Sequence, residues 1–146
     1  MKKLILLFAL LLSLSAFSYS QEVGIRIGEI SGGRGALDVT INTARYNRIH
    51  ADVSFGNGVG IDFLWDLLYR PLAGKQLKWY LGAGPYAKFS DPVWVGAVGE
   101  AGIEYRFKSV PIALGFDWRP FFSILQTTGF TAEGYGLNIR YIFGRK

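Results

Sequence analysis

The fold is decided by residues 93–107, which read VWVGAVGEAGIEYRF. One set of alternate positions in this stretch is entirely apolar or glycine, whereas Glu100, Glu104 and Arg106 all fall on the other set. An alternation of period two puts successive side chains on opposite faces of a β-strand. The stretch therefore predicts one long strand with an apolar face and a charged face.

The same alternation recurs along the chain, with turn residues such as Gly, Asn and Pro between the runs. The predicted strands span residues 22–28, 36–43, 48–55, 59–69, 77–87, 93–107, 110–119 and 135–143. Residues 120–134 are predicted to form the only long loop. Pro85 lies inside the fifth run, where its missing N–H predicts a bulge near one rim. Residues 62–68 also fit a short helix, but the turns on either side favour a strand.

Each predicted strand has one apolar face and one face that carries its charges. In the fourth strand, the apolar face holds Ile61, Phe63, Trp65, Leu67 and Tyr69. The charged faces are predicted to form one network, which comprises Glu22, Arg26, Asp38, Arg48, His50, Asp52, Asp62, Asp66, Arg70, Lys78, Lys88, Glu100, Glu104, Arg106, Asp117, Arg119 and Arg140. If His50 is left out, this set has equal numbers of acidic and basic residues, which predicts salt bridges between strands.

The two faces distinguish a membrane barrel from a soluble one. A soluble barrel buries its apolar face, whereas a membrane barrel turns that face to lipid and encloses a polar interior. The longer runs match the roughly 9–11 residues that a tilted membrane strand needs. Eight strands of about ten residues leave about six residues for each connection. The sequence therefore predicts an all-β protein, an eight-stranded antiparallel up-and-down transmembrane β-barrel over residues 21–146. Its interior is predicted to be filled by paired charges and to form no general pore.

Residues 1–20 are predicted to be a secretory signal peptide. Lys2 and Lys3 precede an apolar run over 4–14, and Ser18 and Ser20 supply small residues before the cleavage site. The run is shorter than the roughly 20 residues that a membrane-spanning helix needs.

The composition excludes two further features. The chain has no Cys, which argues against disulfides. Its net charge of +5 comes without basic clusters, which argues against a nucleic-acid partner.

In this arrangement the chain resembles the small eight-stranded outer-membrane barrels, of which OmpX and the OmpA membrane domain are familiar examples. Its last strand resembles the C-terminal signal that such barrels present to the barrel-assembly machinery, carried here by Tyr135, Leu137, Ile139, Tyr141 and Phe143. In that pattern an aromatic residue usually ends the chain, whereas three more residues follow Phe143 here. Residues 48–56 and 110–120 are also similar to stretches of uncharacterised small outer-membrane proteins. The resemblance implies an outer-membrane location, lipid and the assembly machinery as partners, and no known activity.

Catalytic and metal chemistry would have to use the same residues. His50 with Ser54 invites comparison with outer-membrane lipid A deacylases, but both residues share the predicted interior face, away from a lipid ester. Asp62 and Asp66 lie four residues apart on one strand, about 13 Å, which is too far to share an ion. We therefore expect no cofactor, no metal and no enzyme, but a monomeric barrel with a structural or interaction role. Two alternatives remain open, a lipid-modifying envelope enzyme and a soluble, lipocalin-like periplasmic binder.

Overall fold

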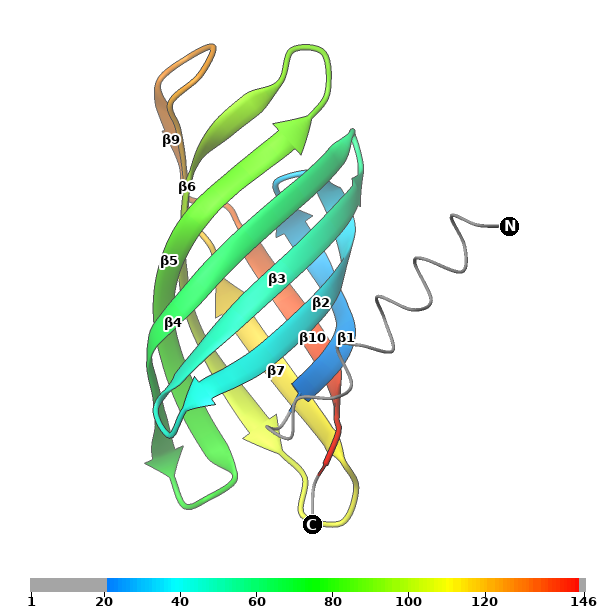
Figure 1. Cartoon of the computed structure of the whole chain (residues 1–146), viewed down its shortest axis with the longest axis vertical. Helices are drawn as coiled ribbons and strands as arrows, with labels where there is room; N and C mark the ends of the chain where they lie inside the picture. The colour runs from blue at the N-terminus through cyan, green and yellow to red at the C-terminus, as the bar shows by residue number, and fades with distance from the viewer. Residues whose placement is uncertain (1–20, 145–146) are drawn as a thin grey trace, which may run out of the picture.

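The computed structural model describes residues 21–144, so the predicted signal peptide at 1–20 lies outside the described residues. These residues form a closed antiparallel β-barrel of eight strands (Figure 1), which confirms the predicted all-β, eight-stranded antiparallel barrel. The barrel strands are β1 (Gln21–Ile30), β2 (Gly33–Ala44), β3 (Asn47–Gly56), β4 (Val59–Ala73), β5 (Leu77–Phe89), β6 (Trp94–Arg106), β7 (Ile112–Trp118) and β10 (Tyr135–Ile142). Strands β1 to β7 pair in chain order, and β10 pairs with both β7 and β1. Each barrel strand therefore has two neighbours, and the wall has no open edge.

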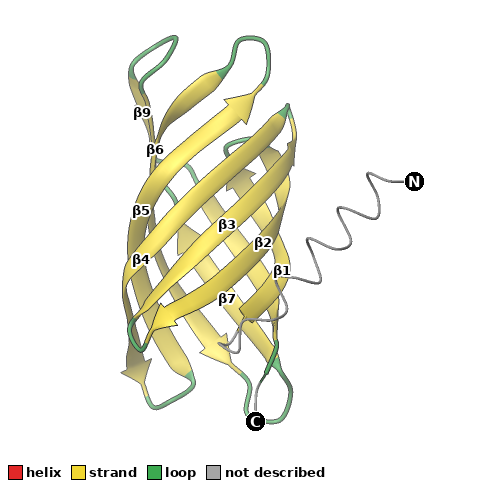
Figure 2. Cartoon of the chain, in the orientation of Figure 1, coloured by secondary structure: helices red, strands yellow, loops and turns green. Residues whose placement is uncertain are grey.

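Only strands and loops occur in the described chain (Figure 2), so the alternative of a helix over 62–68 is wrong. Among residues 21–144, no helix is long and apolar enough to span a membrane. We call the end of the barrel with the turns at 31–32, 57–58 and 90–93 the hairpin end. The opposite end, where the Phe143 N–H donates to the Gln21 carbonyl at 2.8 Å, is called the terminal end.

The segment predicted as a long loop contains two further strands, which corrects that expectation. Strand β8 (Phe121–Ser123) pairs with β6 in the register already used by β7, and β9 (Gly129–Thr131) pairs with β8. The resulting arm rises beyond the wall at the hairpin end (Figure 1). The physical reason is that β6 has 13 residues and β7 only seven. The part of β6 nearest the hairpin end therefore has backbone N–H and C=O groups that need another hydrogen-bonding partner.

Pro85 causes no bulge, contrary to the prediction. The pairing of β4 with β5 has the same register on both sides of Pro85, and it shifts instead between Asp66 and Leu68. Pro85 still pairs with Ala97 of β6, and its side chain lies on the exposed outer face. The missing N–H thus costs pairing only on the β4 side, and the strand continues without an inserted residue.

The bulge in β4 reverses the faces of the residues that follow it. Because side chains alternate with a period of two, one extra residue at Leu67 moves each later side chain to the other face. Tyr69, predicted on the outer apolar face, is therefore inside and 4% exposed. Arg70, predicted in the interior network, is exposed outside, with its guanidinium carbon 5.2 Å from the ring centre of Tyr46.

Elsewhere the two faces differ sharply in chemistry. Outward side chains such as Phe63, Trp65 and Ile103 are large, apolar and about half exposed. Most inward side chains are polar or charged and fully buried. An apolar cluster also lies inside towards the hairpin end, made of Leu64, Tyr86, Val98 and Phe121 with Trp94 packed against it.

Candidate functional site: the charged interior

The barrel interior collects most of the charged residues that the alternation selected. Thirteen of them have at most 1% of their surface exposed: Glu22, Arg26, Asp38, Arg48, His50, Asp52, Asp62, Asp66, Glu100, Glu104, Asp117, Arg119 and Arg140. Three more are half-buried, namely Lys78, Lys88 and Arg106. Arg70 is the one that the strand bulge places outside. Charges so completely removed from water are stable only when they are paired and hydrogen-bonded.

Glu104 is the centre of the network towards the terminal end. Its carboxylate accepts hydrogen bonds from Arg48 at 2.9 Å, from Arg106 at 2.8 Å and from Arg140 at 2.7 Å. The Tyr69 hydroxyl donates a fourth, at 2.8 Å. One carboxylate from β6 thus ties together side chains from β3, β4 and β10, which lie on different sides of the wall.

Arg119 has the same role towards the hairpin end. Its guanidinium lies 2.5 Å from Asp52 and 3.0 Å from Glu100, and 3.8 Å from both Asp62 and Asp117. These acids come from β3, β6, β4 and β7, respectively. Arg119 follows β7 directly, at the point where the chain leaves the barrel for the arm. A single guanidinium with five donors can serve several carboxylates in this way.

Two further ion pairs connect β1 with β7 and β6. Arg26 of β1 binds Asp117 of β7 at 2.5 Å, and Asn138 of β10 donates to the same carboxylate at 2.9 Å. At the terminal end, Arg106 also pairs with Glu22 of β1. Since β10 lies between β1 and β7, these contacts run across the seam where the two ends of the sheet meet.

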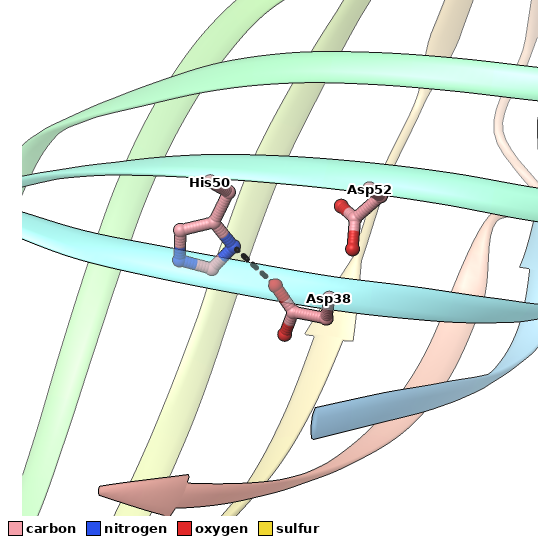
Figure 3. Close-up of side chains that lie close together, drawn as sticks. All are labelled: Asp38, His50 and Asp52. Carbon is pink, nitrogen blue, oxygen red and sulfur yellow. Dashed lines mark ion pairs between the residues drawn. The ribbon is translucent and has the colours of Figure 1, made fainter. Parts of the chain in front are cut away.

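His50 lies among carboxylates in the middle of the barrel. Its Nδ1 is 3.9 Å from Asp38 Oδ1 (Figure 3). The same nitrogen is 3.5 Å from Glu100 Oε1, and Nε2 is 3.1 Å from Asp66 Oδ2. Its Nδ1 makes no hydrogen bond within the described residues, whereas its Nε2 faces the Asp66 carboxylate. The Ser54 hydroxyl instead accepts from the Gly32 N–H at 2.9 Å. The polar groups nearest to His50 are therefore carboxylates on the interior face. Ser54 does not pair with His50.

Sequence reasoning missed two tyrosines that pack within the charged network, Tyr69 and Tyr80. The Arg48 guanidinium lies between the rings of Tyr69 and Tyr80, 4.2 and 4.3 Å from their centres. Tyr80 shares the alternate positions of Lys78, so the alternation could have assigned it to the interior. The position of Tyr69 depends on the bulge, which has no sequence signal as clear as a Gly or Pro.

Each mouth of the barrel contains a cavity. One of about 310 Å³ lies at the hairpin end, beside Glu29, Tyr86 and Lys88. Another of about 340 Å³ lies at the terminal end, beside Arg45, Tyr69 and Lys78. Between the two mouths the interior is occupied by the side chains of the charged network and the apolar cluster. The arrangement joins the strands of the wall through the interior.

The last strand presents the predicted assembly residues outward. Tyr135, Leu137, Ile139 and Tyr141 are each about half exposed on β10, and Phe143 follows the strand with its ring 4.9 Å from that of Tyr141.

No protein-family model and no curated protein matches this chain. Its function is therefore argued from the geometry of the barrel.

Proposed function

We propose that this protein is an integral β-barrel of the bacterial outer membrane with a structural or interaction role and no enzymatic activity. The observation that carries the proposal is the inverted polarity of the barrel, which has charged side chains buried inside and apolar side chains exposed outside. This arrangement is favourable in a lipid bilayer, because lipid chains cover the belt of apolar side chains on the outer face. The backbone N–H and C=O groups are paired around the closed wall and need no water.

The outer face supports lipid as the partner of the barrel. Isolated apolar side chains are common on soluble proteins, but a continuous apolar belt is not. Here the belt runs over every barrel strand, with Ile25, Leu37, Phe63, Leu81 and Leu114 each at least 42% exposed. A soluble lipocalin-like binder would have its apolar side chains inside, so this alternative fits the geometry poorly.

The interior supports a structural role. Eight strands enclose a space that side chains can fill, and the Glu104 and Arg119 clusters fill it with ion pairs between distant strands. The arm of β8 and β9 is the surface best placed to meet a partner, since it projects beyond the wall. An enzyme acting on lipid A is less well supported, because His50 and Ser54 are buried inside and a lipid ester would lie outside. Assembly would use the barrel-assembly machinery, and the finished protein would be a monomer that binds no nucleic acid.

Single thiols test the location of the outer face. The chain has no Cys, so Ile103→Cys and Thr127→Cys each introduce a unique probe, on the apolar belt and at the exposed tip of the arm. An even number of strands puts both termini on the periplasmic side and the arm outside the cell. In intact cells, a charged reagent that cannot cross membranes should therefore label Thr127→Cys and leave Ile103→Cys unlabelled. A membrane-soluble reagent should label Ile103→Cys. Release of the protein with the soluble periplasmic fraction, or free labelling of Ile103→Cys by the charged reagent, would contradict the proposal.

A further inference from the structure

Three aspartates form a row across neighbouring strands in the middle of the barrel. Asp38 of β2 is directly opposite Asp52 of β3, and Asp52 is directly opposite Asp62 of β4. All three are buried, with at most 1% of their surface exposed. Like charges directly opposite each other destabilise a sheet. The spacing within single strands gave no reason to expect this row, because only the register between strands creates it.

The interior also has more negative than positive charge. The described residues bury eight carboxylates completely but only four guanidinium groups, and counting the half-buried Arg106 makes five. The interior network therefore has three more carboxylates than arginines. Lys78 and Lys88 lie near opposite ends of β5, beside the two mouths, whereas the aspartate row lies between them.

The His50 side chain points into this excess of acid. It is two residues from Asp52 on the same face of β3 and fully buried, and its Nδ1 makes no hydrogen bond within the described residues. Figure 3 shows its Nδ1 directed at Asp38, at a distance of 3.9 Å, with the Asp52 carboxylate alongside. A buried nitrogen without a hydrogen bond is costly, so the orientation of Nδ1 towards carboxylates calls for a bound partner.

We propose that His50, Asp38 and Asp52 bind one divalent transition-metal cation inside the barrel. One nitrogen or oxygen from each of these residues lies within 4.8 Å of the others. Two ligands at about 2.0 Å from a tetrahedral zinc ion are about 3.3 Å apart, so the ligand atoms would have to approach one another by at most about 1.5 Å to close the site. The cation's two charges would offset two of the three negative charges that the interior has in excess.

The surrounding contacts are those of a supported metal site. Arg140 binds Asp38 Oδ2 and Arg119 binds Asp52 Oδ2, so in each carboxylate the other oxygen remains for the cation. Asp52 Oδ1 has no hydrogen bond, and Asp38 Oδ1 has only the Thr40 hydroxyl, at 3.3 Å. Asp66, 3.1 Å from Nε2 of the imidazole, is placed to hold the ring with Nδ1 facing the cation.

The ligand chemistry selects the class of cation. Imidazole nitrogen suits Zn²⁺, Cu²⁺, Fe²⁺ and Ni²⁺, whereas Mg²⁺ and Ca²⁺ prefer sites made only of oxygen. One imidazole with two carboxylates therefore favours Zn²⁺ over Ca²⁺, and we use these two ions as the probe and its comparison.

The experiment is a titration of the purified, untagged protein in detergent micelles, stripped of metal by a chelator. Because His50 is the only histidine of the chain, isotope-labelled histidine gives one pair of ring-nitrogen signals in an NMR spectrum. One equivalent of Zn²⁺ should shift the Nδ1 signal, and the same amount of Ca²⁺ should not. Calorimetry should give one Zn²⁺ per chain.

Three variants separate binding from folding. Asp52→Asn should lower the Zn²⁺ affinity by at least about 100-fold, because a ligand is lost, and Asp66→Asn by about 10- to 100-fold. Glu22→Gln, which removes a buried carboxylate at the terminal end, should leave the affinity within about threefold, in the range of a site without shared contacts. Circular dichroism checks that each variant is folded. Absence of Zn²⁺ binding to the folded wild-type protein, an unchanged Nδ1 signal, or equal affinity in Asp52→Asn would overturn the proposal. None of these results depends on whether the barrel lies in a membrane.

Discussion

Glu104 and Glu100 offer a direct measure of how much the geometry of the interior network contributes to stability. Both lie on the inward face of β6, four residues apart, and neither has more than 1% of its surface exposed. They differ in their partners, since Glu104 accepts four hydrogen bonds and neither oxygen of Glu100 accepts any. Replacing each by Gln removes one charge and keeps nearly the same shape.

The expected losses follow from these contacts. A hydrogen bond that involves a charged group contributes about 1.5–3 kcal/mol, and removing one partner of a buried ion pair costs about 3–5 kcal/mol. Glu104→Gln leaves three arginines facing a neutral amide whose NH₂ cannot accept their hydrogen bonds. We therefore expect it to lower the free energy of unfolding by about 3–5 kcal/mol.

Glu100→Gln should cost less than about 1 kcal/mol. The Glu100 carboxylate lies 3.0 Å from Arg119, but its burial is not offset by a hydrogen bond. A neutral side chain is easier to bury, and Arg119 keeps its contact with Asp52. The loss of one attraction and the gain in burial then nearly cancel.

The assay is urea unfolding of each variant reconstituted in lipid vesicles, followed by tryptophan fluorescence. A chelator is present throughout, so that no metal bound near His50 contributes to the comparison. A difference of about 3 kcal/mol between the variants corresponds to a more than 100-fold change in the unfolding equilibrium. Equal losses for the two substitutions would refute the reasoning, because burial of charge and not hydrogen-bond geometry would then set the stability.

Three further outcomes follow from the structure. Tyr69→Phe removes a hydrogen bond to a buried carboxylate and should cost about 1.5–3 kcal/mol in the same urea assay, whereas Arg70→Ala should cost less than about 1 kcal/mol. The opposite order would mean that the fourth strand lacks its bulge. Gly102→Ala adds a methyl group 2.4 Å from the Tyr80 ring and should lose about 1–3 kcal/mol, while Gly35→Ala, with nothing within 4 Å, should be nearly neutral. Finally, Phe143→Ala should reduce the amount of folded barrel in outer-membrane fractions more than removal of the three residues that follow it. Equal reductions in the two proteins would argue against an aromatic assembly signal.

The alternation of side chains determined most of this protein by itself. A period of two needs no knowledge of distant contacts, because it follows from the geometry of an extended chain. It predicted eight barrel strands, and it assigned inward positions to Glu104, Arg119 and His50 before any pairing was known. It also predicted that the charged face would be the inner one, since long strands with a charge-free apolar face suit lipid.

Tertiary structure decided what depends on register. The bulge at Leu67 shifts the pairing of β4 with β5, and this single extra residue exchanged the positions of Tyr69 and Arg70. The long loop became an arm because β6 is longer than β7 and its free backbone groups can pair with β8. Local sequence carries neither fact, since each is the consequence of matching two strands that are far apart along the chain.

The aspartate row shows the same limit at the candidate site. The sequence identifies Asp38, Asp52 and Asp62 as inward residues on three successive strands, but not that they lie directly opposite one another. A register shift of two residues would keep all three inside and separate them along the barrel axis. The faces of the strands are thus a property of the sequence, whereas the neighbours of His50 are a property of how the strands pair.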